Sequence, residues 1–335
     1  MKFREVGGVR LSAVGLGTWQ FGSREWGYGP DYAQCIAPEV LGGSLDLGVN
    51  LVDTAEIYGF GRSERIVGEA LAGRRDEAFI ATKLFPVAPF DPVLTRRARG
   101  SAARLGVEVI DLYQVHWPNP VVPLSATMGP LSRLQREGLI GHIGVSNFQL
   151  ARWRSAEEML GGPVLSNQVR YNLVDRRIER ETLPWAQEHD RLILAYSPLQ
   201  QGLLSGRYGP DNLPKGFRAN TSDFLPENLR RIEPLLEVLR SVAQAHEASP
   251  AQVALAWCLR RPNVIVIPGA SSVAQAESNA AAADLDLTDD EDAELTAASD
   301  AYAPVRGAAA AGSLAKRAAG RFGERVRGVA DGLRA

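Results

Sequence analysis

The sequence predicts a (β/α)8 barrel, and three observations support this fold class. Strand-like apolar runs alternate with helix-like segments along nearly the whole chain, and eight such runs follow an opening hairpin. Eight β/α units in about 290 residues match the size of this barrel. No GxGxxG sequence opens any of the units, which argues against the alternative of a doubly wound sheet.

The expected strands begin at the amino terminus. The segment KFREVGGVRLSAVG predicts a β-hairpin in which Gly7 and Gly8 supply the turn. Eight parallel strands then follow as short apolar runs, at Val14, Leu51, Ile80, Leu112, Ile143, Leu165, Leu192 and Ile265.

Helix-like segments separate these strands. They cover residues 38–48, 63–71, 91–105, 131–137, 150–160, 178–189, 232–246, 251–259 and 273–283. Ser63 is a candidate N-cap for the second of them. Between the first strand and the first helix, WQFGSREWGYGPDY is expected to form a loop.

The composition is that of an ordinary soluble protein, with 335 residues and a formal net charge of −2. This charge gives no reason to expect a nucleic-acid partner. No apolar run approaches the roughly 20 residues of a membrane span, and the first residues hold no apolar block of signal-peptide length. Cys35 and Cys258 lie far apart without metal-ligand spacing, so both are expected to be free thiols. We therefore expect a cytoplasmic protein without a membrane partner.

Four polar residues stand at, or just after, the ends of neighbouring strands. Asp53 ends NLVD, Lys83 ends FIATK, and His116 ends IDLYQVH. Tyr58 follows Asp53 in the segment DTAEIYG. Taken singly, each has an ordinary structural explanation, such as a turn residue or a packed imidazole. In a barrel, however, the carboxyl ends of all strands lie on one face, so the four should converge into a potential proton-donating site.

A series of motifs carries a resemblance to a known family over about residues 1–300. They are GLGTW (15–19), NLVDTAEIYG (50–59), ATK (81–83), VHWP (115–118), GLIGHIGVSNF (138–148), SNQVRYNLVDR (166–176), AYSPLQQGLLSGRY (195–208) and IPGASS…N (267–279). In these motifs the sequence resembles the aldo/keto reductase superfamily. The resemblance implies that a hydride passes between C4 of a nicotinamide and a carbonyl carbon, while a tyrosine gives its proton to the carbonyl oxygen.

The resemblance implies a role for each of the four residues. Tyr58 would be the general acid. Lys83 would lower the pKa of Tyr58, because a nearby cation favours the phenolate, and Asp53 would hold Lys83 in place. His116 would polarise or orient the carbonyl oxygen. No metal is expected, because Tyr58 and His116 would meet the developing alkoxide.

The resemblance also places a bound dinucleotide, whose three parts would contact three sets of residues. The nicotinamide end would contact Gly17, Thr18, Trp19, Asp53, Ser146, Asn147, Gln168 and Tyr196, the last by stacking. The pyrophosphate would lie against Ser197, Pro198, Leu199, Gln201, Gly202 and Leu203, with Arg207 and Arg218 as cations. The adenine end would lie against Ile267, Gly269, Ser271, Ser272, Gln275 and Asn279.

The last motif departs from the family pattern at one position. Family members that prefer NADPH often carry Arg or Lys shortly after the PG(T/A) turn, whereas this chain has Ser272. A helix that begins at Ser271 and Ser272 can hold an anion through its free N–H groups, although a bidentate contact is lost. NADPH is therefore the expected form of the NADP coenzyme, with NADH or the use of both as the alternative.

The substrate pocket is expected to have apolar or aromatic walls and to take a small aldehyde or ketone. Its residues would be Trp19, Trp26, Tyr28, Tyr58, His116 and Trp117. Aromatic residues of the same loop, which also include Phe21 and Tyr32, have an alternative role in pinning that loop to the barrel. No cluster of cations other than Lys83 marks the pocket for a strongly anionic substrate.

The resemblance defines one domain, residues 1–302, and stops there. Residues 303–335 form a basic Ala/Gly-rich tail in which apolar residues recur every three or four positions. This pattern favours an amphipathic helix on the barrel or a frayed tail, with binding to a membrane surface or a partner as the alternative.

Two other functions have to be weighed against carbonyl reduction. A cofactor-binding regulatory or redox-sensing subunit would keep the cofactor motifs, but the intact set of four residues favours catalysis. A barrel hydrolase would need a carboxylate pair. Glu56 lies three residues from Asp53, but no second carboxylate ends a neighbouring strand. The sequence thus predicts an NAD(P)H-dependent oxidoreductase that acts on carbonyl groups.

Overall fold

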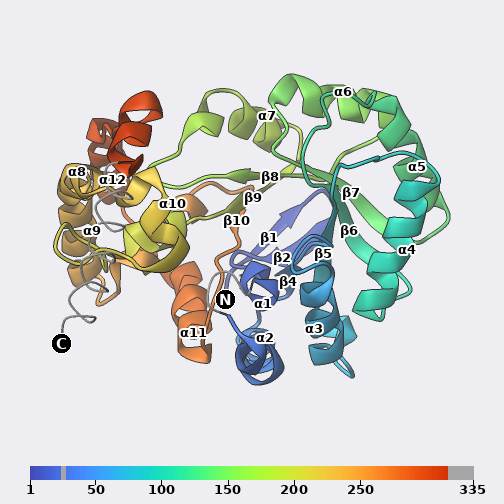
Figure 1. The fold of residues 1–335 in the computed structure, drawn as a ribbon, viewed down its shortest axis with the longest axis horizontal. Helices are drawn as coiled ribbons and strands as arrows, with labels where there is room; N and C mark the ends of the chain where they lie inside the picture. The colour runs from blue at the N-terminus through green and yellow to red at the C-terminus, as the bar shows by residue number, and fades with distance from the viewer. Residues whose placement is uncertain (24–27, 316–335) are drawn as a thin grey trace, which may run out of the picture.

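The computed structural model describes residues 1–23 and 28–315 and has an eight-stranded parallel sheet at its centre (Figure 1). The strands pair in chain order, as β3 (Leu16–Gly17), β4 (Leu51–Asp53), β5 (Phe79–Leu84), β6 (Ile110–Val115), β7 (Ile140–Ser146), β8 (Ser166–Arg170), β9 (Leu192–Tyr196) and β10 (Val264–Val266). Two bridges, Val14 with Val266 and Gly17 with Gly269, join the first strand to the last. Gly15 N also donates to Val266 O at 2.8 Å. The predicted (β/α)8 barrel is confirmed.

Helices alternate with the strands as expected. They are α1 (Trp19–Gly22), α2 (Ala37–Asp46), α3 (Arg62–Ala70), α4 (Val93–Leu105), α5 (Ser125–Arg136), α6 (Leu150–Leu160), α7 (Thr182–Glu188), α8 (Pro226–Arg231), α9 (Glu233–Ala245), α10 (Pro250–Leu259), α11 (Val273–Ala281) and α12 (Asp289–Ala301). Short 3₁₀ segments occur at Arg75–Glu77, Arg177–Arg180, Gln200–Ser205, Gly216–Asn220, Ser222–Phe224 and Ala282–Asp284, and a π-helical turn at Tyr32–Ile36 leads into α2. None of the helices within the described ranges has the length and apolarity that a membrane crossing requires.

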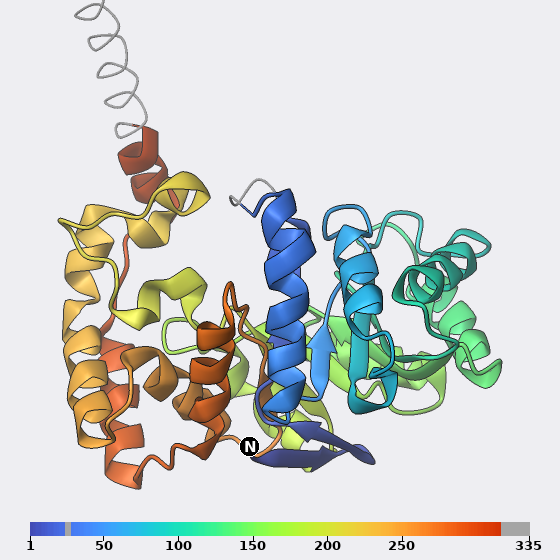
Figure 2. The same cartoon turned by 90° about the horizontal axis from the view of Figure 1, so that it is seen from below.

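The predicted hairpin is also confirmed, as β1 (Phe3–Val6) and β2 (Val9–Ser12). Gly7 and Gly8 have φ angles of 60° and 80°, which glycine adopts without steric cost and which a tight hairpin turn requires. Figure 2 shows the hairpin at one end of the molecule, opposite the helical residues 307–315. Val6 and Leu11 project from it into the apolar interior of the barrel.

Side chains alternate between two apolar cores along each strand, because successive residues of a strand point to opposite faces. Leu51 and Ala81 belong to the inner core, inside the barrel, whereas Val52 and Ile80 belong to the outer core beneath the helices. The same alternation turns Asp53 and Lys83, two positions after Leu51 and Ala81, into the barrel mouth at the carboxyl ends of β4 and β5.

Three local predictions are wrong. Ser63 is not an N-cap. Gly61 occupies that position, and Ser63 Oγ instead donates to Thr18 O at 2.9 Å. The expected helix over 178–189 is split into a 3₁₀ segment and α7, because Pro184 has no N–H to donate to the preceding turn. The expected loop over 19–32 instead begins with α1, and its last residue, Tyr32, is the first of the π-helical turn.

The first residues beyond the barrel lie against α8. Asn228 Nδ2 donates to Val305 O at 3.1 Å and its Oδ1 accepts from Val305 N at 2.7 Å, while Arg231 Nη1 donates to Ala303 O at 2.8 Å. Residues 307–315 are helical, with Ala310 buried. The prediction for the rest of the tail, residues 316–335, lies outside the described residues.

Candidate active site

A buried ion pair forms the centre of the site at the barrel mouth. Lys83 Nζ donates to Asp53 Oδ1 at 2.6 Å and to Thr54 O at 2.8 Å, and neither charged side chain is more than 3% exposed. The pairing of β4 with β5 sets Asp53 opposite Ala81, so Lys83 is the next inward-facing residue on β5. Burial by itself lowers the pKa of Lys83, but the adjacent Asp53 carboxylate outweighs it and holds that pKa above its usual value. Lys83 is therefore a fixed cation.

Gln168 reaches Asp53 from the far side of the barrel. Its Nε2 donates to Asp53 Oδ2 at 2.7 Å, so each carboxylate oxygen of Asp53 accepts a hydrogen bond. Lys83 and Gln168 together hold the Asp53 carboxylate in one orientation.

Tyr58 lies on the turn after β4, with its hydroxyl 3.3 Å from Lys83 Nζ. Burial raises the pKa of Tyr58 above its usual value, and Lys83 opposes this change. The predicted influence of Lys83 thus has the right sign, but the net shift is upward. The phenol is consequently protonated at neutral pH and holds a proton that it can donate.

His116 follows β6 directly and completes the set of four. Its ring meets Tyr58 edge-on with centroids 5.9 Å apart, and it stacks on Trp117 at 3.9 Å. Burial, together with the charge of Lys83, lowers the pKa of His116 to about 2, so the imidazole is neutral. Its buried Nδ1 has no hydrogen-bond partner among the described residues. An unpartnered nitrogen of a neutral ring is best an acceptor, which leaves the Nε2 proton available to a ligand.

We expect His116 to make folding stability dependent on pH. The unfolded imidazole has a pKa near 6.5, whereas the folded one has a pKa of about 2. Below pH 6.5 the unfolded state therefore binds a proton that the folded state does not bind. As a result, the free energy of unfolding falls by about 1.4 kcal/mol for each pH unit. Denaturant unfolding between pH about 7 and about 4.5 should show a shallower loss of stability for His116→Asn than for wild type. His189→Asn, at a 43% exposed side chain, is the matched control, and equal slopes for wild type and His116→Asn would contradict the expectation.

Aromatic side chains line the mouth near His116. Trp19 and Trp117 are 40% and 41% exposed. Phe85 lies 5.8 Å from Trp117 and 6.4 Å from His116 between ring centroids. Phe85 was not among the predicted pocket residues, although it stands two residues after Lys83, directly beyond the end of β5. Trp19, Phe85 and Trp117 give the mouth an apolar, aromatic lining.

The other aromatic residues of the loop after β3 have a structural role. Phe21 and Tyr32 are buried, and the Tyr32 hydroxyl donates to Ala270 O at 3.0 Å. The Tyr28 ring packs against Tyr32 at an interplanar angle of 47°, with centroids 4.7 Å apart, and its place in the pocket stays a prediction. Trp26, also predicted there, lies outside the described residues.

Four residues predicted to hold the nicotinamide end do gather at the mouth. Ser146 Oγ donates to Gln168 O at 2.8 Å, and Asn147 Nδ2 donates to Ser146 Oγ at 3.0 Å. Asn147 Oδ1 accepts from the Tyr196 hydroxyl at 2.9 Å. The ends of β7, β8 and β9 thus present one connected polar surface beside the Lys83–Asp53 pair.

Two predicted cofactor contacts are not supported. Thr18 N and Oγ1 both donate to Asp53 O at 2.9 Å and its carbonyl accepts from Ser63, so its polar groups are used inside the barrel wall. The side chain of Ile267 packs in the inner core. Gly17 is required by the barrel itself, because a Cβ there would lie 2.8 Å from Ile267 O.

The predicted pyrophosphate loop follows β9 and has an unusual backbone. Ser197, Gln200 and Gln201 have φ angles of 49°, 45° and 57°, which cost free energy in residues other than glycine. Buried Asn172, which was not among the predicted site residues, offsets this cost by donating to Ser197 O and to Gln200 Oε1, both at 2.9 Å. Arg218 Nε donates to Gln201 O at 2.9 Å. The loop is therefore held in a fixed shape.

Other predicted residues of this loop occupy different environments. Leu203 is fully buried, so only its backbone can meet a ligand. Pro198, Leu199 and Gly202 lie in the same turn, and Arg207 lies over the ring of Tyr208.

Polar side chains of the predicted adenine segment bind one another. Ser272 is the N-cap of α11 and accepts from Gln275 N at 3.3 Å. Gln275 Oε1 accepts from Ser271 N at 2.8 Å, and Asn279 Nδ2 donates to Gly269 O at 3.4 Å. The backbone N–H groups of Ser271 and Gln275 are thus occupied within the segment itself.

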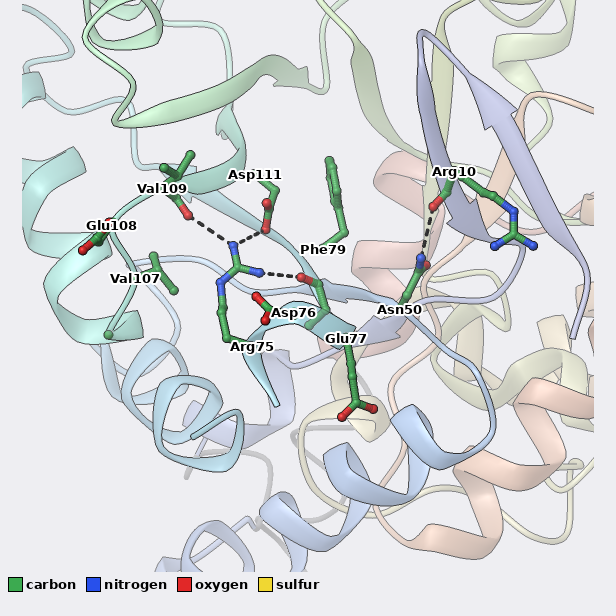
Figure 3. Close-up of a pocket in the computed structure, with 12 residues that line it drawn as sticks. Arg10, Asn50, Arg75, Asp76, Glu77, Phe79, Val107, Glu108, Val109 and Asp111 are labelled. Atoms are coloured by element: carbon green, nitrogen blue, oxygen red, sulfur yellow. Dashed lines mark hydrogen bonds and ion pairs between the residues drawn. The ribbon is translucent and has the colours of Figure 1, made fainter. Parts of the chain in front are cut away.

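A separate surface pocket of about 620 Å³ lies at the opposite end of the barrel (Figure 3). It adjoins Phe79 and Val109, at the amino ends of β5 and β6. Arg75 donates there to Asp111 Oδ2 and Ala78 O, both at 2.6 Å. Because the four candidate residues stand at the carboxyl ends, this pocket is distinct from their site. No cluster of side chains suited to a metal ion occurs among residues 1–23 and 28–315.

Comparison with known proteins agrees with the barrel and its motifs. The model of the aldo/keto reductase family matches residues 13–300. An uncharacterized oxidoreductase of Mycobacterium tuberculosis is 53% identical over 91% of this chain and 95% of its own length. An NADH-specific methylglyoxal reductase of Escherichia coli is 33% identical over 84% of this chain and 92% of its own length. An aldo/keto reductase from Klebsiella pneumoniae, solved with NADP and acetate, has a TM-score of 0.72 and 31% identity, over 91% of this chain and 97% of that one.

Proposed function

Because the chain belongs to the aldo/keto reductase family, we propose that it reduces aldehydes or ketones with a nicotinamide coenzyme as hydride donor. The observation that carries this proposal is the position of Lys83 Nζ between two oxygens, Asp53 Oδ1 at 2.6 Å and the Tyr58 hydroxyl at 3.3 Å, beside a neutral imidazole. A protonated phenol next to a fixed cation can act as a general acid.

Each residue has a separate task in this reaction. Tyr58 gives its proton to the carbonyl oxygen, and Lys83 stabilises the phenolate that remains. Neutral His116 orients the same oxygen through its Nε2 proton. Asp53 keeps Lys83 charged without touching the substrate. Trp19, Phe85 and Trp117 place apolar surface around the opening, and a bound substrate that displaces water there would feel these electrostatic effects more strongly.

The residues present fit a dinucleotide, which when bound would supply the hydride. Asn147, Ser146 and Gln168 form a polar surface suited to a carboxamide, and the ring of Tyr196 lies beside it. The loop after Tyr196 has a fixed shape and is the segment that we propose to hold the diphosphate; Gln200 N and Gly202 N donate within the loop, to Ser197 O and Leu199 O at 2.9 Å, so its other polar groups would make the contact. Gly17, Trp19, Pro198, Leu199, Gly202 and Arg207 stay predicted contacts.

The regulatory alternative has less support. All four residues of the acid site are present and in contact, which a subunit without turnover does not require. The hydrolase alternative loses its second carboxylate, because Glu56 is bound by Arg97 and Phe85 N.

Coenzyme oxidation by the purified chain tests the proposed function. Nicotinamide absorbance should fall when NADPH is mixed with members of a panel of small aromatic and aliphatic aldehydes and ketones. If the coenzyme binds but no member of the panel is reduced with either NADPH or NADH, the regulatory alternative replaces the enzyme.

We expect NADPH to bind more tightly than NADH, because the helix start at Ser271 and Ser272 can still attract its extra phosphate. The preference should be modest, because Ser272 stands where a guanidinium would be. Ser272→Arg should therefore tighten NADPH binding by about tenfold and leave the NADH dissociation constant nearly unchanged. Fluorescence titration with both coenzymes measures this. A wild-type dissociation constant much lower for NADH than for NADPH would overturn the coenzyme assignment.

A further inference from the structure

Arg170 is the last residue of β8, at the open end of the barrel. On this strand Gln168 faces the interior, where it binds Asp53, and Val169 belongs to the outer core. Strand alternation therefore turns Arg170 inward, two residues beyond Gln168 and nearer the opening. It pairs in register with Tyr196 of β9, and its guanidinium carbon lies 5.8 Å from the centre of the Tyr196 ring.

The charge of Arg170 has no protein counterion. Across residues 1–23 and 28–315, no carboxylate lies within ion-pair distance of it, and its buried Nε has no hydrogen-bond partner. Two other partly buried arginines on the barrel, Arg97 and Arg191, are paired with Glu56 and Glu157, both at 2.5 Å. A partly buried guanidinium without an anion is costly, since its desolvation is not offset. An incoming oxyanion would offset it.

We propose that Arg170 binds an oxyanion at the barrel mouth, and that this oxyanion is a carboxylate or phosphate carried by the carbonyl substrate. This rests on the proposed function, because it places the reacting carbonyl beside Tyr58 and His116 in the same opening. The guanidinium is a planar donor that can hold a carboxylate or phosphate through two parallel hydrogen bonds. The substrate class is thus an acidic aldehyde or ketone, for which the sequence had indicated no cation other than Lys83.

The diphosphate of the coenzyme is the other source of an oxyanion. The loop proposed to hold it runs from the end of β9, and the adenine segment follows β10, on the side of β9 away from β8. Arg170 stands on β8, so the arrangement favours the substrate as the source.

A matched pair of substrates tests the inference. Benzaldehyde and 4-carboxybenzaldehyde differ only in one carboxylate, and kcat/KM should be measured for both with the wild type, Arg170→Gln and Arg177→Gln. Arg177 is the control because it has the same charge near the mouth but is 81% exposed and paired with Asp175. Arg170→Gln should lower the ratio of kcat/KM for the acid to that for the neutral aldehyde by about 10- to 100-fold, and Arg177→Gln should leave it near the wild-type value.

The remaining outcomes distinguish the substrate from the coenzyme as the source of the oxyanion, and the anion site at Arg170 from the proposed carbonyl reduction. If Arg170→Gln weakens NADPH binding and lowers both reactions equally, the oxyanion belongs to the coenzyme. If neither the ratio nor NADPH binding changes more than in Arg177→Gln, Arg170 is not an anion site. Wild-type enzyme that reduces neither of these aldehydes, nor any member of the wider panel, would instead contradict the proposed function. In that case, calorimetric titration of wild type and Arg170→Gln with 4-carboxybenzaldehyde and benzaldehyde still tests the contact. The contact is supported if Arg170→Gln no longer binds the acid more tightly than benzaldehyde while its unfolding temperature is unchanged.

Discussion

Replacing Tyr58 with Phe is expected to lower the rate of carbonyl reduction by about 10²- to 10⁴-fold, the usual contribution of a positioned general acid. The change removes one oxygen, which lies 3.3 Å from Lys83 Nζ, and leaves the aromatic ring against His116. Because the deleted hydroxyl is not part of the predicted coenzyme surface, the NADPH dissociation constant should change little. Steady-state kcat/KM and fluorescence titration measure the two effects.

Tyr171→Phe is the matched control for this substitution. It deletes the same atom from a tyrosine of the outer core, whose hydroxyl donates to Glu179 at 2.7 Å. It should reduce stability without a comparable loss of turnover. A Tyr58→Phe enzyme that keeps wild-type turnover would show that another group supplies the proton.

Replacing Lys83 with Met is expected to abolish measurable turnover and to destabilise the fold by about 3–5 kcal/mol. The reason is that the Asp53 carboxylate would stay buried without its cation, while the phenolate of Tyr58 would lose its stabilising charge. Denaturant unfolding measures the first effect and coenzyme oxidation the second.

A double variant separates these two consequences. Asp53→Asn with Lys83→Met removes both charges, so most of the lost stability should return, whereas turnover should not. Arg74→Met, which breaks an exposed ion pair with Glu77, is the control and should affect stability little. Full turnover in Lys83→Met would contradict the role of the lysine.

Much of the fold could be predicted from the sequence because strands and helices differ in their apolar period. All eight parallel strands lie where apolar runs predicted them, and the convergence of Asp53, Lys83 and His116 follows from their places at neighbouring strand ends. The site could be predicted to this extent because barrel geometry alone decides which face the strand ends share.

The predictions that failed concern the hydrogen-bond partners of polar side chains. Ser63 resembled an N-cap and Thr18 a cofactor contact, yet the two bind each other across 45 positions of sequence. Asn172 and Arg170 were not predicted for a related reason. Asn172 matters because it binds the distant Ser197 and Gln200, and Arg170 matters because no carboxylate among the described residues pairs with it. Local sequence patterns carry no information about such pairings. The net direction of the Tyr58 pKa shift was likewise not predicted, because it depends on burial that only the packed structure defines.

The most direct test of carbonyl reduction is to follow the hydride. NADPH deuterated at C4 should be prepared in both stereochemical forms and incubated with the full-length chain and an aldehyde that it consumes. The account predicts that one of the two forms delivers its deuterium to the carbinol carbon of the product alcohol, and that Tyr58→Phe slows this transfer without redirecting it. Product alcohol without deuterium from either form would contradict hydride transfer at this site.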